Sequence, residues 1–414
     1  MVPKKYKPTL LACCLTSASS AIPNVLSPLL FTTFHKVYGI SYTLLGFLVV
    51  LNFATQLLID LIYSFFSGKL NLKLSVKLTS GAIFGGLFLY ALSPVLFPAA
   101  PYLGLALGTV IFSAGSGLAE VLTSPVVTAI PSDDPDQTLS LLHSGYAWGL
   151  LIIVIGSGLF LSAVGSERWQ LLTLVLSVLP LITFVLMLLS PIPALSSQEN
   201  VAADGGVLRN RTALLFVLCI FFAGAAELTM CQWCSGYLET TFAIPKALGD
   251  LVGLALYAAA LTVGRTLYTR RGGDIDKVLI FGSLGATVCY AAAAISSSPV
   301  VGLIACALSG FFVAMLWPGS LIAVTKRIPN AGVNLFAMMA VGGDLGGTFY
   351  PQLVGIITDA VSGSARMTAL GARLGLGSEQ FGMKVGMLFA VLAPLGAVLF
   401  FTLASRIPAA EKET

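Results

Sequence analysis

The chain has 414 residues, of which 57% are hydrophobic and only 10% are charged. A soluble chain of this length would carry charges at about 25% of its positions, so the composition excludes a soluble globular protein and predicts an integral membrane protein. The net charge of +4 comes without a basic patch interleaved with aromatic residues, which argues against a nucleic-acid partner.

Apolar runs long enough to cross a bilayer recur twelve times, each at or above the roughly 17–25 residues that a spanning helix needs. We therefore predict an all-α membrane protein with twelve transmembrane helices. The runs lie at residues 9–33, 41–66, 75–97, 102–130, 137–163, 169–190, 213–240, 248–268, 277–297, 300–325, 333–360 and 383–405. The first is far longer than the roughly 7–15-residue apolar core of a signal peptide, so we expect it to be retained.

The widest polar connection, residues 191–211, divides the twelve runs into six and six. It predicts an N-terminal six-helix bundle over 1–190, a linker over 191–211 and a C-terminal bundle over 212–414. A short internal repeat supports related halves, because residues 31–34 (FTTF) match residues 239–242 (ETTF) at three of four positions. Unrelated helices of similar composition would also give so short a match.

Most of the 22 Lys and Arg residues fall in the termini and in the connections on the N-terminal side of the membrane. By the positive-inside rule, we predict a multi-pass protein of the cell (inner or plasma) membrane with both termini and the linker in the cytoplasm. The connection before the fifth run is acidic instead. There we expect Asp134 to cap the helix and Pro135 to occupy its first turn.

The seventh run carries polar residues at a depth where lipid should surround the helix. An ionised Glu near the bilayer centre costs at least about 2.5–3.5 kcal/mol, so such residues mark a solute or ion pathway. We predict that Glu227, Gln232 and Trp233 contribute to a substrate site. The alternative is a structural Glu227, protonated or paired with a neighbouring helix. The nearby Cys231 and Cys234 are expected to be small packing residues and not a metal or redox pair.

Four stretches carry a family resemblance, at residues 115–120 (GSGLAE), 139–149 (LSLLHSGYAWG), 310–318 (GFFVAMLWP) and 342–351 (GGDLGGTFYP). Over its whole length the chain resembles the major facilitator superfamily, and in these stretches it is similar to the fucose-permease-like branch of sugar–proton symporters. The resemblance implies two pseudo-symmetric six-helix bundles that transport by alternating access. The chain departs from fucose members at Asn24, where they carry an acid on the first helix, and its second connection lacks the acid of the superfamily signature.

The resemblance implies that Glu120 is the proton-coupling carboxylate, and His143 on the next helix is its expected partner for relaying charge. Either residue could instead be structural. Amides, carboxylates and aromatic rings suit a small hydroxylated solute. The expected substrate-binding residues are Asn24, Asn52, Gln56, Tyr146, Trp148, Glu227, Gln232, Trp233, Tyr257 and Trp317. The tryptophans at 148 and 233 lie too deep in their runs for an interfacial belt.

Three further charged residues are predicted to act in gating, namely Asp60, Arg265 and Asp344. Asp60 could instead lie in the hydrated interface, and Arg265 could extend to that interface. Asp344 lies among four glycines, at 342, 343, 346 and 347. These predict either a pliable segment that moves during transport or static close packing against a neighbouring helix.

The sequence therefore predicts a secondary active transporter that moves a small polar solute, with a sugar as the favoured class, by proton symport. The alternatives are a drug–proton antiporter or a sugar exporter and, in a different class, a transporter-like sensor or a membrane-embedded enzyme. No zinc-protease, nucleophile-elbow or phosphate-loop motif is present, so we expect no enzyme, cofactor or metal. The expected partners are the solute, protons and the lipid bilayer, with the protein as a monomer. The solute, the direction of transport and the choice of proton or sodium stay open.

Overall fold

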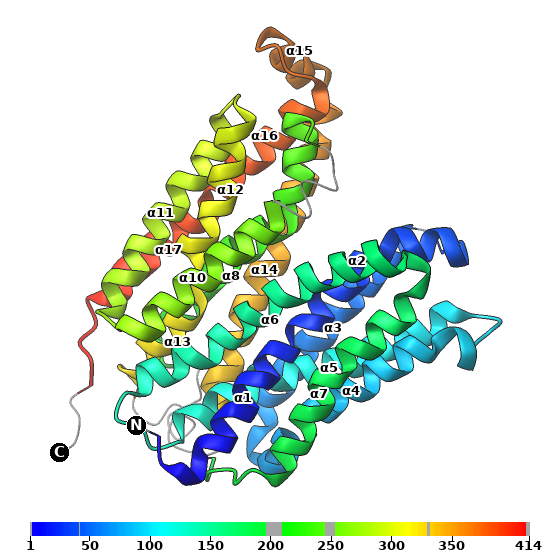
Figure 1. Ribbon diagram of the computed structural model, residues 1–414. Coiled ribbons are helices and arrows are strands. Elements are labelled where there is room, and N and C mark those ends of the chain that lie inside the picture. Colours follow the sequence, from blue (N-terminus) through cyan, green and yellow to red (C-terminus); the bar gives the residue numbers. More distant parts are fainter. Residues whose placement is uncertain (1, 41, 196–208, 245–252, 329–331, 411–414) are drawn as a thin grey trace. The chain divides into compact units, whose positions relative to one another are not determined.

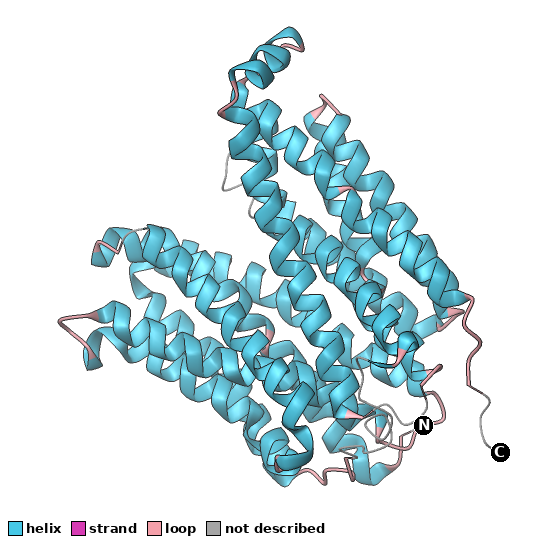
Figure 2. Ribbon diagram, turned by 180° about the vertical axis from the view of Figure 1, so that it is seen from behind, coloured by secondary structure: helices cyan, strands magenta, loops and turns pink. Residues whose placement is uncertain are grey.

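The computed structural model describes residues 2–40, 42–195, 209–244, 253–328 and 332–410. Within these ranges the regular structure is helical, with no strand (Figure 2). Ten segments of the described chain are long and apolar enough to cross a membrane. Within the described residues, each predicted apolar run lies mainly in helix, which confirms the all-α membrane fold and is consistent with twelve spans.

The chain forms two compact units, described here separately. The first comprises Met1–Val207 and Ala331–Val341, and the second comprises Leu208–Asn330 and Gly342–Thr414. Residues 196–208, which make up most of the predicted linker, lie outside the described residues. The domain boundaries expected from the sequence therefore stay a prediction.

The first unit is a bundle of long apolar helices (Figure 1). Short 3₁₀ turns, at Lys4–Tyr6, Ser67–Lys69 and Ser166–Arg168, precede or join them. The helices are α1 (Lys7–Ser19), α2 (Ala21–Tyr38), α3 (Tyr42–Phe66), α4 (Leu72–Leu96), α5 (Pro101–Thr128), α6 (Pro135–Val164) and α7 (Trp169–Leu189).

The second unit repeats the helical architecture and adds one short helix, α15, between two spans (Figure 1). The first residues of α14, up to Val341, group with the first unit. The helices are α8 (Arg211–Phe242), α10 (Ala255–Arg271), α11 (Ile275–Ile295), α12 (Pro299–Val313), α13 (Leu316–Thr325), α14 (Val333–Ser362), α15 (Ala365–Arg373), α16 (Ser378–Ala390) and α17 (Leu392–Ser405).

Three predicted spans are interrupted shortly before a proline. The breaks separate α1 from α2, α12 from α13 and α16 from α17, and they precede Pro23, Pro318 and Pro394. Proline has no backbone N–H, so the carbonyl four residues earlier loses its intrahelical donor. Pro28 and Pro180 lie inside continuous helices, so a proline alone does not decide where a break occurs. Each break leaves a carbonyl that must find another partner.

Side-chain caps fix where several helices begin. The carboxylate of Asp134 accepts a hydrogen bond from the Gln137 amide at 3.0 Å, with Pro135 in the first turn, as predicted. Asn71 likewise accepts from the Leu74 amide at 3.1 Å and begins α4. These caps satisfy amide groups that have no partner within the helix. The residues next to each cap therefore determine where these two helices begin.

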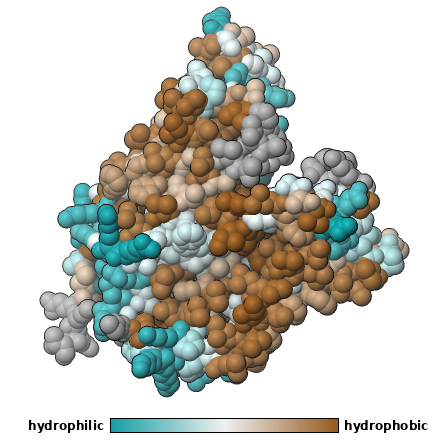
Figure 3. All heavy atoms as spheres, in the orientation of Figure 1, coloured by the Kyte–Doolittle hydropathy of each residue, from teal (hydrophilic) through white to brown (hydrophobic). Residues whose placement is uncertain are grey.

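The outer surface of the helices is apolar over most of its length. Large side chains such as Phe47, Ile152, Phe281 and Leu399 are more than half exposed. Figure 3 shows broad hydrophobic areas along the helices, with hydrophilic residues gathered toward helix ends and connections. A monomeric soluble protein rarely exposes apolar patches of this extent, so lipid is the solvent of these faces.

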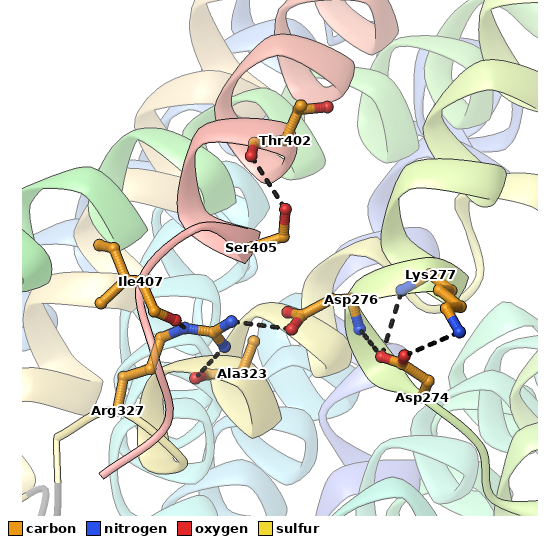
Figure 4. Close-up of polar contacts among 8 residues, drawn as sticks. All are labelled: Asp274, Asp276, Lys277, Ala323, Arg327, Thr402, Ser405 and Ile407. Carbon is orange, nitrogen blue, oxygen red and sulfur yellow. Dashed lines mark hydrogen bonds and ion pairs between the residues drawn. The ribbon is translucent and has the colours of Figure 1, made fainter.

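Arg327 forms hydrogen bonds with residues at or near the ends of three helices of the second unit (Figure 4). Its Nη2 donates to the Asp276 carboxylate at the start of α11 at 2.7 Å, and its Nε donates to the Ile407 carbonyl beyond α17 at 2.9 Å. A third bond, from Nη1 to the Ala323 carbonyl, is 3.2 Å long. Because the Arg327 side chain is only 3% exposed, these bonds anchor the end of the bundle.

Asp274 caps α11 beside this cluster (Figure 4). Its carboxylate accepts from the Asp276 amide at 3.1 Å and from the Lys277 amide at 3.5 Å, and it forms an ion pair with the Lys277 side chain. Slight burial raises the pKa of Asp274, but the hydrogen bonds and charge of Lys277 outweigh this and hold the pKa below its usual value. The cap is therefore formed by the ionised carboxylate.

Candidate functional site

Four of the predicted substrate-binding residues meet in the first unit around the side-chain amide of Asn24 on α2. Asn24 Oδ1 accepts a hydrogen bond from Asn52 Nδ2 at 3.0 Å and another from Gln56 Nε2 at 3.1 Å. Asn24 Nδ2 donates to the Tyr146 hydroxyl of α6 at 3.3 Å. Ser113 of α5 donates to Asn52 Oδ1 at 2.6 Å. We call these five residues the amide cluster.

The position of the amide cluster follows from helix geometry. Asn52 and Gln56 are four residues apart on α3, so both point to the same side of that helix. They are 4% and 3% exposed, and Asn24 is half-buried. Burying an amide without hydrogen bonds is costly, so the side chains of neighbouring helices must satisfy one another. The result is a neutral polar region, with both donors and acceptors, inside an apolar bundle.

Glu120 and His143 occupy adjacent helices of the same unit, α5 and α6. Both are half-buried. His143 Nε2 lies 3.3 Å from the hydroxyl of Ser124, and Ser124 is one helical turn after Glu120. The predicted acid and the hydroxyl partner of the histidine therefore share one side of α5.

Asp60 lies one turn beyond Gln56 on α3, on the same side of the helix as the amide cluster. Its side chain is fully buried. This burial removes it from the hydrated interface that the sequence left open as an alternative. Its role in gating stays a prediction.

In the second unit, Glu227 of α8 and Arg265 of α10 form a buried ion pair. Arg265 Nη2 donates to Glu227 Oε1 at 2.7 Å. The side chain of Arg265 is 3% exposed and that of Glu227 is 9% exposed. The Tyr257 hydroxyl of α10 donates to the Glu227 backbone carbonyl at 2.7 Å. Three residues that the sequence placed in substrate binding or gating thus form one cluster. Arg265 is buried and does not extend to the interface.

Two predicted aromatic residues of the second unit pack against α14. Trp233 donates its indole N–H to the Pro351 carbonyl at 2.9 Å. The ring of Trp317 lies against Gly224 and Gly343, where an added Cβ would come within 2.9 Å and 2.2 Å of ring atoms. Asp344, the residue after Gly343, is 8% exposed. These contacts give both tryptophans a packing role, and solute contact stays a prediction for them.

The other two predicted binding residues have exposed side chains. Trp148 of α6 is 48% exposed, and Gln232 of α8 is also exposed. Gln232 follows Glu227 by five residues, which turns it well away from the Glu227 side of the helix. Their roles in solute binding stay predictions.

Two polar groups of these clusters are not among the residues predicted from the sequence. Ser113 belongs to the amide cluster, and its signal was available, since it lies seven residues before Glu120 and so on the same side of α5. The backbone carbonyl of Ala314 accepts a hydrogen bond from Arg265 Nε at 2.9 Å. Its signal was Pro318, four residues later, which cannot supply the usual donor.

Among the described residues, no group of three or more His, Cys, Asp or Glu side chains is arranged to hold a metal ion. Cys231 and Cys234 form no disulfide bond. The amide cluster offers groups for hydrogen bonding, and the Glu227–Arg265 cluster offers an ion pair.

The chain is similar to known transporters in sequence and in fold. The family model for the Major Facilitator Superfamily matches residues 9–351. A crystal structure of the superfamily transporter FucP in the outward conformation is 20% identical with a TM-score of 0.73, and the match covers 97% of this chain and 100% of that chain. A variant of the E. coli fucose:proton symporter FucP is 21% identical, with 97% and 100% coverage and a TM-score of 0.72.

The proton:xylose symporter XylE, in a structure bound to 6-bromo-6-deoxy-D-glucose, is 14% identical with a TM-score of 0.76, and the match covers 100% of this chain and 98% of that chain. Identities this low establish the shared fold alone. No curated protein matches the chain at a significant level.

Proposed function

We propose that this membrane transporter, which belongs to the major facilitator superfamily, moves a small polar solute, a sugar or a close chemical relative, together with protons. The amide cluster of the first unit is the observation that carries the proposal. A buried amide is costly unless it is hydrogen-bonded, and here side chains from three helices satisfy one another around Asn24. They give the interior of an apolar bundle a polar region that suits a polar solute.

The chemistry of the amide cluster favours a neutral, hydroxylated solute. An amide offers two donors and an acceptor, and a sugar hydroxyl both donates and accepts, so the two can form paired hydrogen bonds. The bonds described here use one of the two amide hydrogens of Asn24 and one of the two of Gln56. A drug–proton antiporter should have an apolar and aromatic-rich cavity instead. The amide cluster therefore favours a sugar–proton symporter over a drug–proton antiporter.

The solute class is tested directly with the purified full-length protein. We expect at least one compound in a panel of sugars, polyols and nucleosides to raise its melting temperature, because a ligand that binds only the folded state stabilises it. The panel is measured at two pH values, and compounds that bind are then tested for uptake into proteoliposomes with an imposed pH gradient. Binding confined to apolar cations would contradict the proposal and favour the antiporter.

The amide cluster gives the first prediction. Asn24→Ala removes the central amide and leaves Asn52 and Gln56 without an acceptor, so we expect solute affinity to fall at least tenfold. Gln170→Ala is the matched control, because Gln170 is an amide of the same unit outside the amide cluster, where it donates to the Tyr38 hydroxyl at 3.4 Å. Normal solute binding by Asn24→Ala, in a protein as stable as the control, would remove the amide cluster from the binding site.

The second prediction concerns proton coupling by Glu120. Glu120→Gln carries a neutral amide that resembles the protonated acid, so we expect it to lose uphill accumulation driven by a pH gradient while solute exchange continues. Accumulation and exchange are measured in the same proteoliposomes, with the exposed Glu167→Gln as control. Undiminished proton-driven accumulation would show that another residue carries the coupling.

The orientation proposed for the protein follows the distribution of Lys and Arg, with both termini in the cytoplasm of a cell membrane. On this orientation, the clustered chain ends around Arg327 lie at the cytoplasmic side. Labelling single cysteines introduced near the termini, with a reagent that does not cross the membrane, tests this arrangement.

A further inference from the structure

The Glu227–Arg265 ion pair satisfies only one oxygen of the buried carboxylate. Glu227 Oε1 accepts from Arg265 at 2.7 Å, whereas Oε2 is buried and has no hydrogen-bond partner among the described residues. An ionised carboxylate has about four acceptor sites and usually receives several donors when buried. One oxygen of Glu227 is therefore left in an environment that suits a neutral acid better than an anion.

Nearby hydroxyl groups do not supply the missing donor. The Tyr257 hydroxyl of α10 donates to the Glu227 backbone carbonyl, and the Tyr290 hydroxyl of α11 donates to the Ala226 carbonyl at 2.5 Å. Both tyrosines thus hold the backbone of α8 in place and leave the carboxylate alone. The side chains flanking Glu227 on its own helix, such as Ala223 and Met230, are apolar and fully buried.

Arg265 has an anchor that does not depend on the charge of Glu227. Its Nε donates to the Ala314 carbonyl at 2.9 Å, at the break between α12 and α13. That carbonyl lost its helical donor because residue 318 is proline. The glycines Gly264 and Gly310 bring α10 and α12 into backbone contact at this point. Arg265 can therefore keep its position when the bond to Glu227 weakens.

The titratable and charged groups near Glu227 come from several helices. Arg265 carries a positive charge that favours the ionised carboxylate, and the other groups are hydroxyls and thiols. Asp344 is a second buried acid of the unit, next to the Gly343–Gly224 contact between α14 and α8. The groups that interact with Glu227 are Arg265 and Tyr257 on α10 and Cys231 on α8 itself. Tyr290 on α11 lies beside Tyr257, and Cys234 on α8 and Cys306 on α12 lie beside Tyr290.

We propose that Glu227 is a proton-binding residue of the second unit, in addition to the acid that couples transport in the first. The proton adds to Oε2, no covalent bond breaks, and the net charge of the pair changes from zero to +1. The bond from Arg265 to Oε1 weakens, while the bond from Arg265 to the Ala314 carbonyl remains. Proton binding thus weakens the side-chain link between α8 and α10, while the Tyr257 bond to the α8 backbone and the Arg265 bond at the break between α12 and α13 both remain.

The proton site at Glu227 is distinct from the proposed symport, and only its part in the transport cycle rests on that proposed function. A proton site in the second unit would make the packing of α8 depend on protonation without any solute contact. The role earlier expected for Glu227, direct binding of the solute, differs from this one, because the Arg265 pair and the apolar flanks leave Oε2 facing no hydroxyl donor.

The test needs no solute, because the proton itself is the probe. Infrared difference spectra of the full-length protein, recorded between neutral and acidic pH, show a carbonyl band for each carboxylate that becomes protonated in the apolar interior. We expect Glu227→Gln to lose one component of this band and Glu239→Gln, an exposed acid on the same helix, to keep it. Glu120→Gln identifies the component that belongs to the first unit.

A second variant serves as a control in case the first does not fold. If Glu227→Gln does not fold, Glu227→Gln combined with Arg265→Gln removes both charges together, and the same band component should be missing. A band of full amplitude in whichever variant folds, or the absence of any pH-dependent band in the wild type, overturns the proposal. Failure of solute uptake with the Glu227 component present would instead count against symport and leave this proton site standing.

Discussion

Arg265→Ala is expected to destabilise the protein by about 3–5 kcal/mol, the usual cost of removing one partner from a buried ion pair. The variant leaves the Glu227 carboxylate buried without its cation and leaves the Ala314 carbonyl without a donor at the break between α12 and α13. The loss is measured as the fall in melting temperature and in the yield of monodisperse protein in detergent.

Two matched variants separate charge from packing. Arg270→Ala removes an exposed arginine five residues later on α10 and should change stability little. Glu227→Met combined with Arg265→Met removes both charges and keeps similar volume, so it should recover most of the lost stability, apart from the cost of the Ala314 carbonyl. If the double variant were as unstable as Arg265→Ala, the loss would come from that carbonyl and not from the unpaired carboxylate.

The spans were predictable from the sequence because bilayer thickness dictates their length and because lipid removes any alternative to helix. The cap at Asp134 was equally local, since one carboxylate and the next three residues decide it. The breaks before Pro23, Pro318 and Pro394 have a visible cause. A proline alone could not predict where they occur, since Pro28 and Pro180 lie in continuous helices.

The sequence identified the candidate residues one by one, but it did not predict which of them meet in space. Asn24 and Tyr146 are 122 residues apart, and Glu227 and Arg265 are 38 apart. Composition marks such residues as unusual in a membrane, but the rotation of each helix about its axis decides which of them meet. Trp148 shows the limit of arguments from depth, because a residue far from the ends of its helix is still 48% exposed. Depth and burial are separate properties in a membrane protein.

The glycines around Asp344 illustrate how packing resolves an ambiguous pattern. The sequence allowed either a pliable segment or close packing. In the structure, a Cβ added to Gly342 would lie 2.8 Å from Val217, and one added to Gly347 would lie 2.0 Å from Leu228. The space beside Gly342, Gly346 and Gly347 is filled by atoms of α8, and the space beside Gly343 is filled by the Trp317 ring. Close packing accounts for the glycines in this structure, and movement of the segment stays a prediction.

Gly346→Ala is therefore expected to be the most damaging small substitution in the second unit. A Cβ at this position would lie 1.8 Å from the Phe221 carbonyl oxygen and 3.1 Å from the Ala225 nitrogen of α8. Neither atom is the end of a flexible side chain, so α14 and α8 must move apart along their contact. Overpacking typically costs about 1–3 kcal/mol, and a clash with rigid backbone belongs at or above the upper end of that range.

The measurement for Gly346→Ala is the melting temperature, followed by solute uptake at a temperature where the variant is still folded. Gly236→Ala on α8 is the control, because an added Cβ there meets nothing within 4 Å and alanine favours helix by about 1 kcal/mol. We expect Gly236→Ala to be neutral or slightly stabilising and Gly346→Ala to lose both stability and uptake. A Gly346→Ala protein that is stable but slow in transport would instead show that α14 yields locally, and the pliable interpretation would then replace close packing at this helix pair.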